Sequence, residues 1–188
     1  MVAGTAKMRR RTRGIRPAWS GFTLLEVAFT LGILVIAIAS SSATTISLSA
    51  LRRSNRERTV AHNAAAALAE RIHAIAHAKI GQPGAWARNV VETVCPANTV
   101  GTSFDVRELE PQDGLAHVGT VLFVPDETRT DQALGVELGM PRDLDGDGAA
   151  DKVDAIGTAK LLPVVIEVKW KGIRGEQRIL HPFYVVGY

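Results

Sequence analysis

The sequence predicts an α+β fold in which one long N-terminal helix packs on a C-terminal antiparallel β-sheet. Two observations support this prediction. Residues 33–80 contain neither proline nor glycine, so nothing there obliges a helix to end, and we expect it to run from Phe22 to near His77. From residue 90 onward, short runs rich in β-branched residues alternate with Gly, Pro and Asp, as in strands separated by turns. A chain of 188 residues suffices for one domain with an ordinary core.

The N-terminal half of the expected helix is apolar. Residues 22–39 contain a single charged side chain, Glu26. Eighteen helical residues are about 27 Å long, close to the hydrocarbon thickness of a bilayer. A carboxyl group in lipid is costly, so Glu26 is expected to have a partner or a function. We therefore expect residues 22–50 to form the membrane half of the helix and residues 51–80 an amphipathic half.

The positive charge of the chain is concentrated at its start. The formal net charge is +3, yet residues 1–21 hold six basic side chains and no acidic one: Lys7, Arg9, Arg10, Arg11, Arg13 and Arg16. Without those six, 16 basic residues remain against 19 acidic ones, a balance of −3. The basic character therefore belongs to the leader and does not indicate nucleic-acid binding. By the positive-inside rule it predicts a cytoplasmic N-terminus and a C-terminal region across the membrane.

The motif at residues 21–27, GFTLLEV, follows this basic leader. It resembles the processing site of the type IV pilin and pseudopilin family, in which prepilin peptidase cuts after the glycine and methylates the new N-terminus. The resemblance implies cleavage between Gly21 and Phe22, N-methylation of Phe22, and a removed leader at residues 1–21. It also implies that Glu26 pairs with the N-terminal amine of a neighbouring subunit during assembly.

The same resemblance implies the location and the partners. The subunit would sit in the bacterial inner membrane with its C-terminal domain in the periplasm. It would then join other pilins or pseudopilins in a type IV pilus or a type II secretion pseudopilus. Major pilins usually have a helix-kinking proline near the place of Ala43, and its absence here indicates a minor pilin or pseudopilin. Many pilins also have a disulfide loop, which the single Cys95 cannot form.

Other interpretations remain open. Residues 22–39 could be a plain membrane anchor, or a signal peptide cut after the small residues of Ala37-Ile38-Ala39. As a plain anchor, this segment would make the chain a membrane-anchored periplasmic calcium-binding protein or hydrolase that is not assembled into filaments. The sequence contains no Gly-rich phosphate loop, Cys/His zinc cluster or Gly-x-Ser-x-Gly motif, so we expect a structural protein and not an enzyme.

The amphipathic half of the helix has three notable groups of side chains. Arg52, Arg53, Arg56 and Arg58 form a basic collar, which could face solvent, lipid headgroups or acidic neighbouring subunits. Leu68, Ile72 and Ile75 share one face and are expected to meet the sheet. Glu70, His73 and His77 occupy the opposite face, where they could bind a metal or simply be the solvated side of the helix.

Residues 81–188 are expected to form a β-rich globular domain. The predicted strands cover residues 89–94, 102–109, 117–124, 161–170 and 176–186. The last two runs are the clearest and are separated by Lys171-Gly172-Ile173-Arg174-Gly175, so they predict a hairpin.

The densest group of acidic residues lies in residues 143–154. Aspartates stand at positions 1, 3, 5, 9 and 12 of a twelve-residue loop and glycine at position 6, which is the spacing of an EF-hand-like calcium loop. The predicted ligands are Asp143, Asp145, Asp147, Asp151 and Asp154, with the carbonyl of Ala149. Aspartate at position 12 resembles the calcium loops of dockerins and other extracellular proteins. A bound Ca²⁺ would offset the repulsion among five acids and stabilise a domain without a disulfide, whereas the alternative is a solvated acidic turn.

Overall fold

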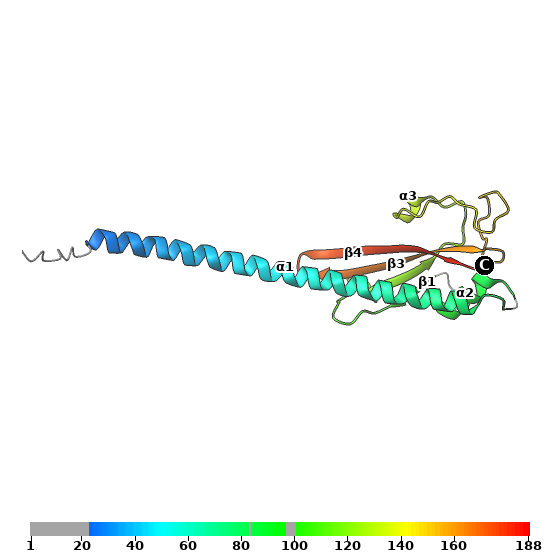
Figure 1. Cartoon of the computed structure of the whole chain (residues 1–188), viewed down its shortest axis with the longest axis horizontal. Coiled ribbons are helices and arrows are strands. Elements are labelled where there is room, and N and C mark those ends of the chain that lie inside the picture. Colours follow the sequence, from blue (N-terminus) through cyan, green and yellow to red (C-terminus); the bar gives the residue numbers. More distant parts are fainter. Residues whose placement is uncertain (1–22, 83, 97–100) are drawn as a thin grey trace, which may run out of the picture. The chain divides into compact units, whose positions relative to one another are not determined.

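The computed structural model describes residues 23–82, 84–96 and 101–188. The elements in chain order are α1 (Leu24–Ala78), α2 (Trp86–Val94), β1 (Gly101–Phe104), β2 (Gly119–Phe123), α3 (Asp131–Leu134), β3 (Leu161–Gly172) and β4 (Gly175–Val186) (Figure 1). The predicted α+β class is confirmed, with a long N-terminal helix and an antiparallel sheet. The chain divides into two compact units, residues 1–46 and 47–188.

The described part of the first unit is helical, and its side chains are exposed from Thr23 to Ile46, with Ala43 left aside. Within the described residues, α1 is the one helix long and apolar enough to cross a membrane by length and composition. The serine and threonine hydroxyl groups further along this helix do not interrupt its apolar character. Ser40, Ser41, Ser42 and Thr44 each donate a hydrogen bond to the carbonyl four residues earlier, at 2.8–3.0 Å. Such internally paired hydroxyls are compatible with lipid, where an unpaired polar group is costly.

The second unit contains a four-stranded sheet in the order β1-β2-β3-β4, with every neighbouring pair antiparallel. The predicted hairpin is confirmed, and its turn is tighter than expected. Gly172 pairs with Gly175, so Ile173 and Arg174 are the only turn residues. Gly175 has a φ of 96°, a backbone conformation that favours glycine at this place.

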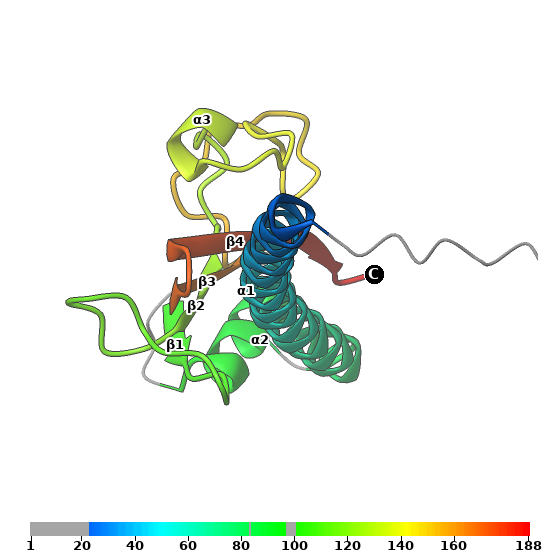
Figure 2. The ribbon, with the colours of Figure 1, turned by 90° about the vertical axis from the view of Figure 1, so that its left-hand side faces the viewer.

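The core of this unit lies between the sheet and the C-terminal half of α1 (Figure 2). The helix contributes a buried stripe of mostly small side chains: Ala61, Ala65, Ala69, Ile72 and Ala76. The sheet contributes larger ones, among them Phe123, Ile166 and Trp170. Ile72 is fully buried as predicted, whereas Leu68 and Ile75 are only partly buried because the alanine stripe makes the closest packing.

The prediction of a strand at residues 89–94 is wrong, because this segment belongs to helix α2. Ala87, Val90 and Val91 are buried, at the i, i+3, i+4 spacing of one helix face. The Trp86 indole Nε1 donates a hydrogen bond of 2.9 Å to the Ala76 carbonyl near the end of α1. Packing on the core thus overrides the strand preference of the β-branched residues.

Residues 124–160 connect β2 to β3 and contain the short helix α3. This connection lies beside β4 (Figures 1 and 2), where the Tyr184 hydroxyl donates a hydrogen bond to the Leu138 carbonyl. The Ala155 amide donates to the Pro125 carbonyl at 2.9 Å, which closes the two ends of the connection onto each other. The segment predicted as a calcium loop lies within it.

Candidate metal centre

Glu127 anchors the acidic loop to the segment that follows β2. Its side chain is fully buried. The Leu144 amide donates to Oε1 at 2.8 Å and the Lys152 amide donates to Oε2 at 3.1 Å. The Glu127 amide also donates to the Lys152 carbonyl at 2.9 Å, and its carbonyl accepts from the Arg142 amide at 3.2 Å. One buried carboxylate therefore holds both sides of the loop.

Asp143 shapes the first turn of the loop around its own carboxylate. Its Oδ1 accepts hydrogen bonds from the amides of Asp145 at 3.2 Å and Gly146 at 2.6 Å, and its Oδ2 accepts from the Gly148 amide at 2.8 Å. Gly146 and Gly148 have φ angles of 78° and 93°. The sharp turn that position 6 was expected to make is thus present at Gly148, where a left-handed backbone favours glycine.

Lys152 crosses the loop and joins two of its aspartates. Its Nζ contacts Oδ2 of Asp145 and Oδ2 of Asp147. Asp145 also accepts a hydrogen bond of 2.6 Å from the Thr158 hydroxyl. The contact with Lys152 first, and the Thr158 bond second, lower the pKa of Asp145 to about 2. The two carboxylates in turn raise the pKa of Lys152 above its ordinary value, Asp145 contributing more than Asp147.

Three acidic side chains converge here in a manner suited to a cation. One oxygen from each of Glu127, Asp143 and Asp145 lies within 4.8 Å of the other two. Glu127 and Asp145 are buried, and Asp143 is half-buried. Carboxylate oxygens suit hard cations such as Ca²⁺ and Mg²⁺, so the donor chemistry of this cluster fits a metal ion. A bound ion would add its positive charge beside the ammonium of Lys152.

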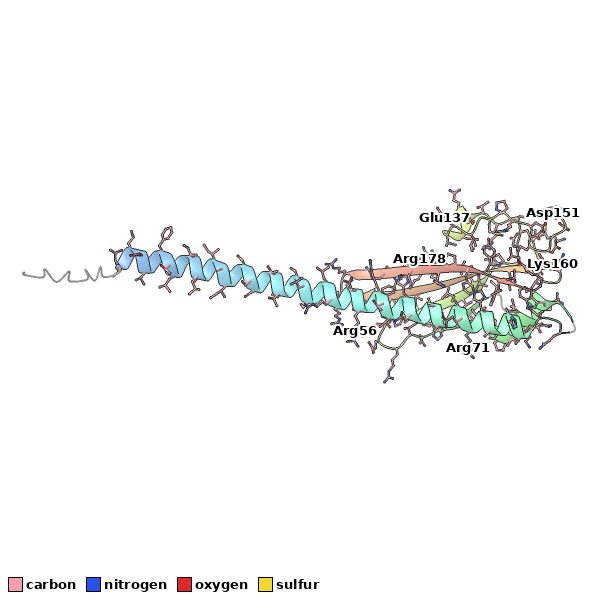
Figure 3. All side chains as sticks on the ribbon, viewed as in Figure 1. Arg56, Arg71, Glu137, Asp151, Lys160 and Arg178 are labelled. Carbon is pink, nitrogen blue, oxygen red and sulfur yellow. The ribbon has the colours of Figure 1, made fainter. Side chains whose placement is uncertain are left out.

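The structure brings together only part of the predicted ligand set. Asp143 and Asp145 belong to the cluster, and Asp147 is joined to Asp145 through Lys152. Ala149, Asp151 and Asp154 are exposed, with Asp151 on the outside of the loop (Figure 3). The Asp154 carboxylate accepts a hydrogen bond of 3.0 Å from the Ile156 amide, which it caps locally.

Two contributors to the centre were missed. Glu127 lies in a different segment from the aspartates, and no spacing rule links it to them. Lys152 stands inside the predicted loop, and a base flanked by aspartates could have indicated an internal ion pair that offsets part of their repulsion.

The other predicted sites are placed as follows. Gly21 and Phe22 lie outside the described residues. Glu26 is exposed in the first turn of α1, where its amide donates to the Thr23 hydroxyl at 3.3 Å. This contact is the half of a capping box in which the Thr23 side chain caps the helix, and it uses the backbone of Glu26 and not its carboxylate.

The histidine-bearing face of α1 is separate from the metal centre. Glu70, His73 and His77 are exposed, and His73 contacts the ring of Phe183, with 5.1 Å between ring centroids. Among the described residues, the acidic groups that converge closely enough to hold an ion are those around Glu127 and not this face.

Comparisons with protein-family models, with curated proteins and with solved structures found no match for this chain.

Proposed function

We propose that this chain is a minor type IV pilin or pseudopilin, a structural subunit of a type IV pilus or a type II secretion pseudopilus. The observation that carries the proposal is the exposed apolar half of α1, which begins at Leu24, directly after the GFT of the cleavage-type motif. Twenty-three residues from Leu24 to Ile46 correspond to about 35 Å of helix, enough to cross the hydrocarbon layer.

Prepilin peptidase would remove residues 1–21 and methylate Phe22. Glu26 would then be the one ionisable side chain of the apolar segment. In lipid its carboxylate requires a cationic partner, and the methylated N-terminal ammonium of a neighbouring subunit has the right charge and two N–H donors. This pairing would set how the helices of neighbouring pilins or pseudopilins align in the filament.

The leader would hold the N-terminus in the cytoplasm, so that residues 47–188 face the periplasm before assembly. The role of this second unit would be structural display and not catalysis. We further propose that it binds Ca²⁺ at the acidic cluster. Glu127, Asp143 and Asp145 would supply oxygens, Asp147 would join when Lys152 moves away, and the ion would stabilise the long β2–β3 connection.

The first experiment on the pilin proposal is an intact mass and N-terminal sequence of the protein recovered from membranes that contain prepilin peptidase. We expect a chain that starts at methylated Phe22. A chain that retains residues 1–21 would reduce the protein to an anchored domain.

In the same strain, Glu26→Ala should be cleaved normally but excluded from filaments, whereas the neighbouring Leu25→Ala, which keeps the carboxylate, should assemble. Normal assembly of Glu26→Ala would disprove the charge-pairing argument.

The calcium proposal is tested by thermal denaturation with added Ca²⁺ and with a chelator. We expect Ca²⁺ to raise the melting temperature, and Asp145→Ala combined with Asp147→Ala to lower it and remove the dependence on Ca²⁺. Lys152→Ala should strengthen Ca²⁺ binding, because it removes the competing ammonium. If Lys152→Ala only destabilises the domain and the chelator changes nothing in the native protein, the lysine is the permanent counter-charge and the calcium proposal fails.

A further inference from the structure

One end of the second unit gathers cationic side chains from two distant parts of the chain. The α1 helix contributes Arg52, Arg53, Arg56 and Arg58, and the β3–β4 turn contributes Arg174, which follows the apolar Ile173. The turn lies against the helix here. Arg58 Nη2 donates a hydrogen bond of 3.0 Å to Gln177 Oε1, and Gly172 is so close to Glu57 that an added Cβ would lie 2.8 Å from Oε2.

The ion pairs of this end leave three arginines without a carboxylate partner. Arg53 pairs with Glu57 at 3.3 Å and Arg56 with Glu108 at 2.9 Å. Three further acids of this end, Asp113, Glu110 and Glu176, lie near Lys171. The Lys171 Nζ is 2.9 Å from Asp113, and its pKa is raised by Asp113 first and more weakly by Glu110 and Glu176. Within the described part of the chain, Arg52, Arg58 and Arg174 form no ion pair. We call these three residues, together with Ile173, the collar surface.

The collar surface is tethered closely to the apolar unit. Arg52 follows Ile46, the last residue of the first unit, by six residues. Six residues cover about 9 Å as a helix and at most about 22 Å when fully extended. If residues 24–46 span the membrane, as the proposed function requires, this end of the second unit stays close to the lipid headgroups whatever its orientation.

Ile173 adds an apolar side chain to this charged surface. It is one of only two residues in the hairpin turn, and it is 49% exposed. An exposed isoleucine beside an arginine matches the interfacial layer of a bilayer, where apolar and phosphate groups meet. Guanidinium groups bind phosphate with two parallel hydrogen bonds, so the chemistry of both residue types fits a phospholipid.

We propose that the collar surface binds anionic phospholipid headgroups on the periplasmic side of the membrane. Arg52, Arg58 and Arg174 contact lipid phosphates, and Ile173 enters the interfacial layer beside them. Such binding fixes the second unit on the membrane surface before the subunit is extracted into a filament. It also predicts that the lipid composition, and not only the apolar helix, determines how this unit is held.

The test uses the full chain, one copy per nanodisc, with Ile173→Cys labelled by an environment-sensitive fluorophore in a Cys95→Ala background. Discs of phosphatidylcholine alone are compared with discs that also contain phosphatidylglycerol. We expect a blue-shifted emission and quenching by spin-labelled lipid in the anionic discs. The triple variant Arg52→Gln, Arg58→Gln, Arg174→Gln should lose this preference, by roughly fivefold per arginine. NaCl near 1 M, where the Debye length is about 3 Å, should weaken it.

The matched control is Arg71→Gln, Lys79→Gln, Arg88→Gln, which removes the same charge farther from the collar (Arg71 is labelled in Figure 3). It should behave as the parent protein does. Equal emission in discs with and without phosphatidylglycerol would overturn the proposal. An equal loss of the preference for anionic discs in the two triple variants would overturn it as well. A label that is shielded only when discs hold two or more copies would instead assign the surface to a second subunit. Insertion of the chain into the discs is scored separately, so failure of the membrane span is distinguishable from failure of headgroup binding.

Discussion

Glu127 connects its own segment to the acidic loop, because its carboxylate oxygens accept the backbone amides of two residues that lie 17 and 25 positions further along the chain. A fully buried carboxylate is stable only when such donors replace water. One of these oxygens also lies within 4.8 Å of a carboxylate oxygen of Asp143 and of Asp145. A single side chain thus has a structural role in the loop and forms one side of the candidate metal centre.

Glu127→Ala would leave the amides of Leu144 and Lys152 without their acceptors. Because each buried, unpaired amide costs about 1–3 kcal/mol, we expect the free energy of unfolding to fall by at least about 2 kcal/mol. Urea denaturation of the detergent-solubilised chain measures this. The control is Glu137→Ala, an exposed acid of the same connection (labelled in Figure 3), which should change little. Equal effects of the two variants would show that Glu127 does not hold the loop.

The candidate metal centre shows which contacts a sequence can predict. The turn at Gly148 and the convergence of Asp143 with Asp145 follow from local spacing, and both are present. Glu127 reaches them only because the β2–β3 connection folds back on itself, a contact between distant segments that no local pattern encodes. Lys152 is a different case, because the spacing of an EF-hand-like loop concerns its acidic positions and says nothing of a lysine between them.

The helices show the same contrast at the scale of elements. The length of α1 was predictable because proline and glycine are missing over a long stretch. In α2, the β-branched Val90 and Val91 favour a strand by local preference, yet both are buried on one helix face. The hairpin β3–β4 was predictable because its strands are long and glycines flank its turn. Elements with strong local signals were thus foreseen, whereas α2, which depends on packing, was not, nor was the short helix α3, and β1 ends at Phe104, before the end of the strand predicted over residues 102–109.

The alanine stripe of α1 is expected to limit side-chain size where the helix meets the sheet. Ala65 is fully buried at the centre of this stripe, whereas the adjacent Ala66 is exposed. Ala65→Leu should lower the free energy of unfolding by about 1–3 kcal/mol, because a well-packed core cannot accept three more carbons without strain. Ala66→Leu has the same helix preference and should be nearly neutral. Chemical denaturation of both variants decides the matter, and a neutral Ala65→Leu would show that the interface is loosely packed.

Asp131 organises the segment after α3. Its Oδ1 accepts hydrogen bonds from the amides of Leu138 at 3.0 Å and Met140 at 2.9 Å, and its Oδ2 accepts from Gly139 at 2.8 Å. These bonds, Met140 first, lower the pKa of Asp131 below its ordinary value of 3.8. The ionised form is therefore favoured by folding. Its stabilising effect is complete above the ordinary pKa and is lost as the pH falls through the lowered value.

Asp131→Asn should consequently lower the melting temperature at neutral pH, because an amide replaces one acceptor by a donor. The difference between the native protein and the variant should shrink as the pH falls below about 4. Melting curves between neutral and acidic pH measure both effects. Asp126 supplies the control through Asp126→Asn, since among the described residues its carboxylate bonds within its own turn and to the exposed Arg129. A difference that persists unchanged at low pH would contradict the assigned role of the ionised group.

At the scale of the whole molecule, the two units differ in how many of their apolar side chains are buried. Every side chain of the described hydrophobic core lies at or beyond residue 60, and the apolar side chains described in the first unit are exposed. The described part of the first unit therefore supplies no residue to this core. Its apolar surface requires another environment, whereas the second unit already satisfies its own.

A chain that begins at Ser47 should accordingly fold without the first unit. We expect its free energy of unfolding to differ from that of the detergent-solubilised full chain by less than about 0.5 kcal/mol, because the described residues before Ser47 belong to an exposed part of α1 and supply no side chain to the core. It should also remain in solution without detergent and fail to sediment with zwitterionic vesicles, because the exposed apolar helix is gone. Denaturation and vesicle sedimentation of the two proteins provide the comparison. A fragment that unfolds or aggregates would show that residues 24–46 stabilise the second unit, and the division into independently folded units would have to be abandoned.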